Sequence, residues 1–332
     1  MRRLLVLAVV FVAILAGLWL GGETLLARQL RKAAAQDPGF QIGAVTELRE
    51  LRRIGVHLAD LRIDRPTGAL ILPMAELWLA PSRLTEARLT LPDTATLETA
   101  AGPKVLGLSG AGADLRLRPL SGLTLGSMGL HSGAMTLDGA ALAKGVKVIA
   151  ELGRLGGDSP QRAIAAYDLD IDLGALDANL LTPELDLPGL LALQARGRVW
   201  LDRAPSPWTL QPGARPLPVG FRIDDGALTL GKVTAHITGR VQADAEGRAE
   251  GELTLSTTDL KPLLQAAANA GLIPKQAVVL AETVAKSLGN RAGAPEPAAD
   301  ATGPELRLPL KFADGKMHLG PLPLGPAPIF PR

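Results

Sequence analysis

The chain has 332 residues, a formal net charge of +2 and 47% hydrophobic residues, but only 3% aromatic residues. Its lysines and arginines do not cluster with aromatic residues, so the sequence lacks both the electrostatic and the stacking features of nucleic-acid binding. It contains no cysteine, which excludes disulfides, thiolate catalysis and Cys-ligated zinc.

An apolar segment begins directly after Met1–Arg3. Leu4–Leu20 contains no charged residue, and residues 4–22 would form a helix about 28 Å long, close to the hydrocarbon thickness of a bilayer. We therefore expect residues 1–22 to be an uncleaved, single-pass anchor in a bacterial inner membrane. The N-terminal arginines would remain cytoplasmic and the bulk of the chain would be periplasmic. A cleaved signal peptide is the alternative, but no convincing small-x-small cleavage motif follows the segment.

Residues 23–37 continue with a helical pattern, which predicts a short juxtamembrane helix that Pro38 and Gly39 end. Residues 38–204 form the first part of a β-rich domain, because short alternating segments are bounded there by proline, glycine or aspartate. The abundance of glycine (37) and proline (26) fits many strands joined by turns. We expect roughly fifteen to twenty strands in the whole chain.

Residues 205–332 form the second part of this domain. A proline-rich connector precedes a long hairpin, and two helices are expected within residues 259–288, the first capped by Asp259. Residues 291–303 have the composition of a disordered linker, and a C-terminal hairpin turns at Asp314 and Gly315. The fold class is therefore mainly β: a transmembrane helix followed by a long, curved antiparallel sheet, forming a groove or half-pipe, with a helical pair near the C-terminus. Two stacked β subdomains divided near the proline-rich connector are the alternative.

The long hairpin has one face of small apolar residues. Apolar residues or glycines alternate with polar residues on both sides of the turn at residues 244–248. This face either lines a groove for a hydrophobic ligand or packs into an ordinary core. The candidate groove-lining residues are Val233, Ala235, Ile237, Gly239, Val241, Ala243, Ala249, Gly251, Leu253 and Leu255.

No motif indicates catalysis, a metal site or a cofactor. The four histidines are isolated from one another, and the aspartates of the YDLDIDL segment lack the glycine and glutamate that a calcium loop requires. These aspartates are better explained as a solvated strand face. The SGAGAD segment at residues 109–114 lacks the third glycine of a dinucleotide fingerprint, and no P-loop or nucleophile elbow is present. We therefore expect a protein that is not an enzyme and has neither cofactor nor metal.

Two stretches, residues 225–273 and 308–330, resemble a bacterial envelope family known as domain-of-unknown-function family 2125. The resemblance extends to the N-terminal anchor and the LRIDRP strand, and it rests on strand and turn signatures. It implies an architecture similar to that of the AsmA-like proteins. Those proteins are anchored in the inner membrane, carry a curved β-sheet with an apolar groove, and are implicated in phospholipid movement and outer-membrane homeostasis.

Two functions follow from these observations. We favour an inner-membrane-anchored periplasmic protein that binds or moves a lipid or another hydrophobic molecule in an apolar β-groove and so contributes to envelope homeostasis. A structural or interaction scaffold is the alternative, because helices with leucine and alanine stripes could cover the same face. The expected partners are the inner membrane and a hydrophobic ligand, without nucleic acid.

Overall fold

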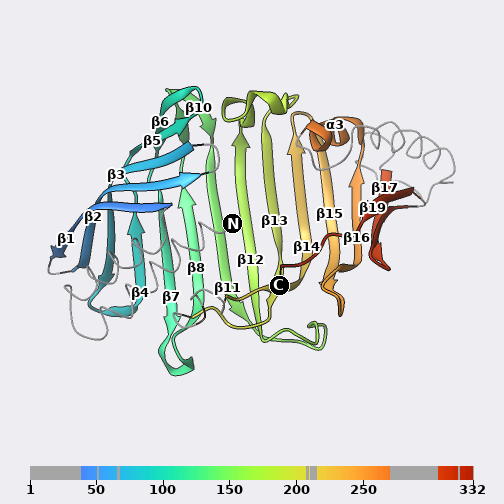
Figure 1. The fold of residues 1–332 in the computed structure, drawn as a ribbon, viewed down its shortest axis with the longest axis horizontal. Helices are drawn as coiled ribbons and strands as arrows, with labels where there is room; N and C mark the ends of the chain where they lie inside the picture. Colours follow the sequence, from blue (N-terminus) through green and yellow to red (C-terminus); the bar gives the residue numbers. More distant parts are fainter. Residues whose placement is uncertain are drawn as a thin grey trace, which may run out of the picture. The chain divides into compact units, whose positions relative to one another are not determined.

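The computed structural model describes residues 39–50, 52–65, 68–206, 209, 215–269, 306–320 and 322–331 (Figure 1). This part of the chain is mainly antiparallel β-sheet, so the β-rich fold class is confirmed. None of its helices is both long enough and apolar enough to span a membrane. The expected anchor at residues 1–22, the juxtamembrane helix at 23–37, the second helix up to residue 288 and the linker at 291–303 lie outside the described residues.

The chain consists of two compact units, and the first boundary between them lies between residues 154 and 155. The first unit also includes residues 203–216, and the second includes the remainder. The first unit contains the described strands β1 (Phe40–Arg49), β2 (Ile54–Arg65), β3 (Gly68–Ala80), β4 (Arg83–Thr90), β5 (Thr94–Thr99), β6 (Gly102–Leu108), β7 (Gly112–Arg118), β8 (Thr124–Ser132), β9 (Met135–Leu137), β10 (Ala140–Ala143) and β11 (Gly145–Gly153), with the short 3₁₀ helix η1 (Pro119–Ser121).

The first unit forks at β3. The C-terminal half of β3 pairs with β4, which continues to β7, β8 and β11, whereas its N-terminal half pairs with β5, which continues to β6, β9 and β10. The main core combines residues of β3 with residues of both branches, including Leu77, Leu115 and Ala95. The fork therefore lets an antiparallel sheet bury part of its apolar face against its own second branch.

The second unit is a meander of strands that follow one another along the chain. It contains β12 (Ala165–Leu176), β13 (Leu191–Leu201), β14 (Pro218–Leu230), β15 (Val233–Ala243), β16 (Ala249–Thr257), β17 (Leu306–Ala313), β18 (Lys316–Leu319) and β19 (Leu322–Pro326), the 3₁₀ helices η2 (Ala178–Leu180) and η3 (Pro183–Leu185), and the helix α3 (Lys261–Asn269). Each strand from β12 to β18 pairs antiparallel with the next one. The first expected C-terminal helix is thus present as α3, and Asp259 caps it by accepting a hydrogen bond of 3.0 Å from the backbone N–H of Lys261.

The two compact units do not coincide with the two parts of the β-rich domain that the sequence suggested, residues 38–204 and 205–332. Residues 155–202 belong to the second unit because β13 pairs with β14 from Leu191 to Leu201. The connector after β13 returns to the first unit, where the carbonyl oxygen of Pro205 accepts a hydrogen bond of 2.8 Å from the N–H of Leu125. Strand pairing therefore places residues 155–202 with the second unit, and the proline-rich connector belongs to the first.

The core of the first unit provides a test of this packing. Replacing Leu77, which is 1% exposed, with alanine should cost about 2–5 kcal/mol of unfolding free energy, because the cavity cannot fully collapse. The change Leu84→Ala, at a residue 50% exposed, should cost less than about 0.5 kcal/mol. Chemical denaturation of both variants measures the difference. Equal midpoints for the two variants would contradict the described core.

Candidate functional site

The ten candidate groove-lining residues lie on β15 and β16 of the second unit. The two strands pair Ile237 with Leu255, Gly239 with Leu253, Val241 with Gly251 and Ala243 with Ala249. Directly opposed residues project to the same side of a sheet, so one face of the hairpin carries these side chains. That these side chains line a groove for a hydrophobic ligand stays a prediction.

The turn between β15 and β16 fixes this register. The Asp244 carboxylate accepts hydrogen bonds from the backbone N–H of Arg248 at 2.7 Å and from its Nε at 2.9 Å. Partial desolvation raises the pKa of Asp244, but these hydrogen bonds and the positive charge of Arg248 outweigh it and hold the pKa below its usual value. The ionised aspartate therefore ties both ends of the turn together and aligns the strands that follow.

The apolar face continues onto the neighbouring strands. Ile237 is paired with Gly226 of β14, and Leu255 is paired with Leu308 of β17. The same pairing pattern reaches β12 and β13, where Leu173 is opposite Leu193. We call this continuous surface from β12 to β18 the apolar face.

A β-bulge keeps β14 aligned with this face. The apolar residues of β14 occupy odd positions up to Ile223 and even positions from Gly226 onward. Asp224 and Asp225 together oppose a single residue of β15, so the extra residue restores the alternation. Without the bulge, half of the strand would turn its apolar side chains to the polar face.

Gly239 and Gly251 have a different role from the one that their spacing suggests. Both have positive φ, +133° and +139°, a region that other residues rarely adopt. A β-carbon at Gly239 would collide with the backbone of Glu252, and one at Gly251 would collide with the backbone of Arg240. These glycines therefore permit close approach of the two strands, and a large side chain at either position would not simply project into a groove.

This backbone role can be measured. The change Gly239→Ala should destabilise the protein by about 1–3 kcal/mol, because alanine would be strained at this φ and would press on the neighbouring strand. Thr238→Ala, one residue away and exposed, should cost less than about 0.5 kcal/mol. Thermal unfolding of the two variants compares them. A Gly239→Ala protein as stable as the original would overturn the backbone role.

Helix α3 covers one part of the apolar face. Leu260, just before the helix, and Leu264 within it pack with Leu255, Leu308 and other leucines of the sheet. Leu255, one of the candidate lining residues, therefore contacts protein. Here the face is an ordinary core.

The segment after β19 covers a second part. Ala327 and Phe330 pack with Val241 and Ala249, and the rings of Phe330 and Phe221 have centroids 6.5 Å apart. Backbone hydrogen bonds of 2.8 Å join Ala249 N–H to the Pro328 carbonyl and Phe330 N–H to the Gly247 carbonyl. Val241 is consequently only 2% exposed.

A third part of the apolar face is partly exposed to solvent. We call it the open apolar surface. It extends across β12 to β15, and its residues alternate along each strand with residues of the polar face. Its residues are Leu169, Ile171, Leu173, Leu193, Ile223, Leu228 and Ile237. Of the ten sequence-based candidates, only Ile237 belongs to it. The alternation of the YDLDIDL segment already indicated the β12 residues, but the contributions of β13 and β14 follow only from the pairing.

The first unit has a smaller counterpart on β8. Met128 is opposite the core residue Leu115, and Leu130 is opposite Ala113. Both therefore project to the core side of the sheet, yet they are 36% and 39% exposed. Each unit thus leaves part of its apolar side uncovered by the described residues.

The comparison with protein families decides the classification. The sequence profile of a bacterial family, described as "Uncharacterized protein conserved in bacteria (DUF2125)", matches residues 52–328. The chain belongs to this family. No curated protein and no solved structure is significantly similar to the chain. The matched segment includes β2 to β19 and so contains the whole open apolar surface of this DUF2125 protein.

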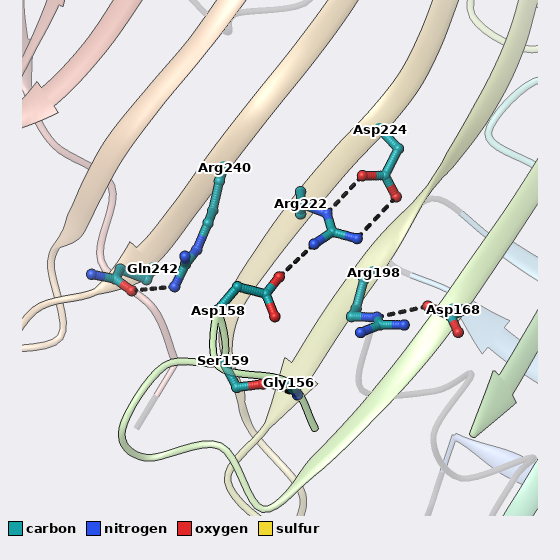
Figure 2. Close-up of polar contacts among 9 residues, drawn as sticks. All are labelled: Gly156, Asp158, Ser159, Asp168, Arg198, Arg222, Asp224, Arg240 and Gln242. Atoms are coloured by element: carbon teal, nitrogen blue, oxygen red, sulfur yellow. Dashed lines mark hydrogen bonds and ion pairs between the residues drawn. The ribbon is translucent and has the colours of Figure 1, made fainter. Parts of the chain in front are cut away.

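The opposite face of the second unit is polar and carries a row of arginines (Figure 2). Arg198, Arg222 and Arg240 are directly opposed on three neighbouring strands, an arrangement in which like charges repel. Asp168 pairs with Arg198 at 2.7 Å and raises its pKa, chiefly through their hydrogen bond. Asp168 therefore compensates the charge of Arg198 within this row.

In this DUF2125 protein Arg222 is also paired with carboxylates, whereas Arg240 contacts an aromatic ring and an amide. Arg222 forms ion pairs with Asp158 and Asp224. The Arg240 guanidinium lies 5.1 Å from the ring centre of Trp200 and donates a hydrogen bond of 2.9 Å to Gln242. Trp200 is fully buried under Ala163 and Val219. These contacts order the arginine side chains on the polar face.

Proposed function

We propose that the protein binds a lipid, or another molecule with a hydrocarbon chain, on the open apolar surface of the second unit. One observation supports this proposal most directly. Seven aliphatic side chains from four neighbouring strands share one face and remain partly exposed, while α3 and the segment after β19 cover the adjacent parts. Contiguous exposed apolar surface with defined borders is typical of a binding surface.

The chemistry of this surface suits an acyl chain. The side chains are leucines and isoleucines, which offer apolar contact without hydrogen-bonding groups. Burial of each methylene group contributes about 0.8 kcal/mol, so a ligand of several methylenes would gain binding energy without a specific polar partner. The absence of a polar motif from the sequence is consistent with such a ligand.

The proposal includes the membrane. A helix at residues 1–22 would hold the sheet at the periplasmic side of the inner membrane, where lipids are available, and the sheet would act as a groove or half-pipe in envelope homeostasis. The composition of Leu4–Leu20 and the resemblance to AsmA-like proteins support this part.

A scaffold is the second candidate function. The packing of Leu264 on Leu255, and of Phe330 near Val241, supports it, because protein already covers most of the hairpin face there. A protein partner could cover the remaining residues in the same way. The two candidates differ in what contacts Ile171.

Photo-crosslinking distinguishes these functions. A benzophenone amino acid at position 171 should capture lipid in cells, because Ile171 projects from the open apolar surface. The same amino acid at position 172 provides the matched control, because Asp172 is the next residue of β12 and is exposed on the polar face. Mass spectrometry of the crosslinked products identifies the captured molecule. Capture of a protein at position 171 without lipid would favour the scaffold, and no capture there would refute lipid binding at this surface.

The anchor is tested separately. Full-length protein should remain with the membranes after alkaline extraction, and a reporter active only in the periplasm should be active when fused after Arg332. Replacing Val10 and Ile14 with arginine should release the protein from the membrane, since each charge at the centre of a span costs about 2.5–3.5 kcal/mol. A shortened, soluble product from the original sequence would instead reveal a cleaved signal peptide.

A further inference from the structure

The first unit contains a cleft of about 610 Å³ over strands β3, β4, β7 and β8. Trp78, Arg88, Asp114, Ser127 and His131 are among its lining residues. Asp114 directly precedes the core residue Leu115 on β7 and therefore projects to the opposite, polar side of the sheet. The cleft is thus distinct from the apolar side of this unit, and its size is within the range of small-molecule sites.

Two buried glycines let polar side chains of the cleft lie close against the sheet. Gly112 of β7 is opposite His131 of β8, and Asp114 of β7 is opposite Gly129 of β8. A β-carbon at Gly129 would collide with the Asp114 carboxylate, and one at Gly112 would lie 3.3 Å from Nε2 of His131. Each polar side chain therefore lies across the glycine of the neighbouring strand. This reciprocal arrangement brings the imidazole and the carboxylate onto the floor of one cleft.

The polar groups of the cleft are free to engage a ligand. Within the described part of the chain, no ion pair or hydrogen bond engages the side chains of Arg88, Asp114 or His131. The Arg88 guanidinium lies 5.3 Å from the ring centre of Trp78, a stacking contact that leaves its N–H groups available. The Trp78 N–H donates to Thr90 at 3.2 Å, which holds the ring in place beside the cleft.

The charge balance of the cleft decides which ligand it suits. Among the described lining residues, the charged side chains are Arg83, Arg88 and Arg116 together with Glu86, Asp93 and Asp114. Glu86 pairs with Arg83 at 3.2 Å and with Arg116 at 3.4 Å, so part of this charge is already satisfied. An anionic ligand would meet carboxylates and a cationic ligand would meet arginines. A neutral ligand whose groups both donate and accept hydrogen bonds fits the mixture best.

We propose that this cleft binds a neutral saccharide, either free or as the headgroup of a glycolipid. Sugar hydroxyls both donate and accept, so they can donate to Asp114 and accept from Arg88, while His131 and Ser127 can do either. Asp114 and His131 are both exposed along the cleft, so a pyranose ring has direct access to these groups. This inference is independent of lipid binding in the second unit.

Saturation-transfer NMR on the full-length protein tests the proposal with a panel of maltose, cellobiose and lactose. At least one disaccharide should receive saturation, and Asp114→Ala should weaken its affinity about tenfold or more, equivalent to about 1.4 kcal/mol. Ser127→Trp should also abolish the signal, because a large side chain would fill the cleft without changing its charge. The matched control is Asp170→Ala, at an exposed aspartate of β12 in the second unit, which should leave the signal unchanged.

Further arms of the experiment separate the sources and the rival ligands. Phosphatidylcholine vesicles with and without a monoglucosyl diacylglycerol distinguish a glycolipid headgroup from a free sugar, and binding to either source supports the proposal. Binding of inorganic phosphate or spermidine in place of every saccharide would overturn it, as would saccharide binding that survives both cleft variants. Lipid capture at position 171 should persist in Asp114→Ala, so failure of the cleft and failure of the apolar surface are distinguishable.

Discussion

Cross-strand register is the constraint on which the second unit depends. In a strand with period two, a slip of one residue would move every apolar side chain to the polar face. The Asp244–Arg248 turn fixes the register of β15 and β16, and the bulge at Asp224 and Asp225 corrects the one place where the alternation of β14 changes phase. The packing of α3, the covering segment after β19 and the open apolar surface all require this alignment.

The same register determines the polar face. Aligning the apolar residues necessarily aligns Arg198, Arg222 and Arg240, so the sheet incurs like-charge repulsion as a consequence of its apolar order. Nearby carboxylates offset this repulsion for Arg198 and Arg222, and the ring of Trp200 stabilises Arg240. Because these groups are partly exposed, each ion pair alone contributes little to the stability of the fold. Together, the partners offset the repulsion that the strand register imposes on the arginines.

The sequence predicted what depends on neighbouring residues along the chain. The alternation on both sides of residues 244–248 predicted the hairpin and its apolar face, and Asp259 marked the start of α3. Contacts between distant segments could not be predicted in this way, because no local pattern indicates that Phe330 returns to Phe221. The positive φ of Gly239 was also hidden, since a small residue in an alternating pattern looks the same whether it leaves space for a ligand or permits strand approach. The cleft of the first unit likewise depends on which residues oppose Gly112 and Gly129, and pairing alone sets this.

Other segments of the chain cover only part of the apolar face. A face covered along its whole length would be a core, and one left bare across seven strands would favour association between molecules. Helix α3 and the segment after β19 bury the side chains around Leu308 and Val241, which confines the exposed part to β12 through β15. The charged residues that alternate with it on the same strands, such as Asp170 and Asp172, project to the other side of the sheet and are exposed to solvent. The exposed apolar area is therefore bordered by covered core within its own face, and the opposite face of the same strands is charged.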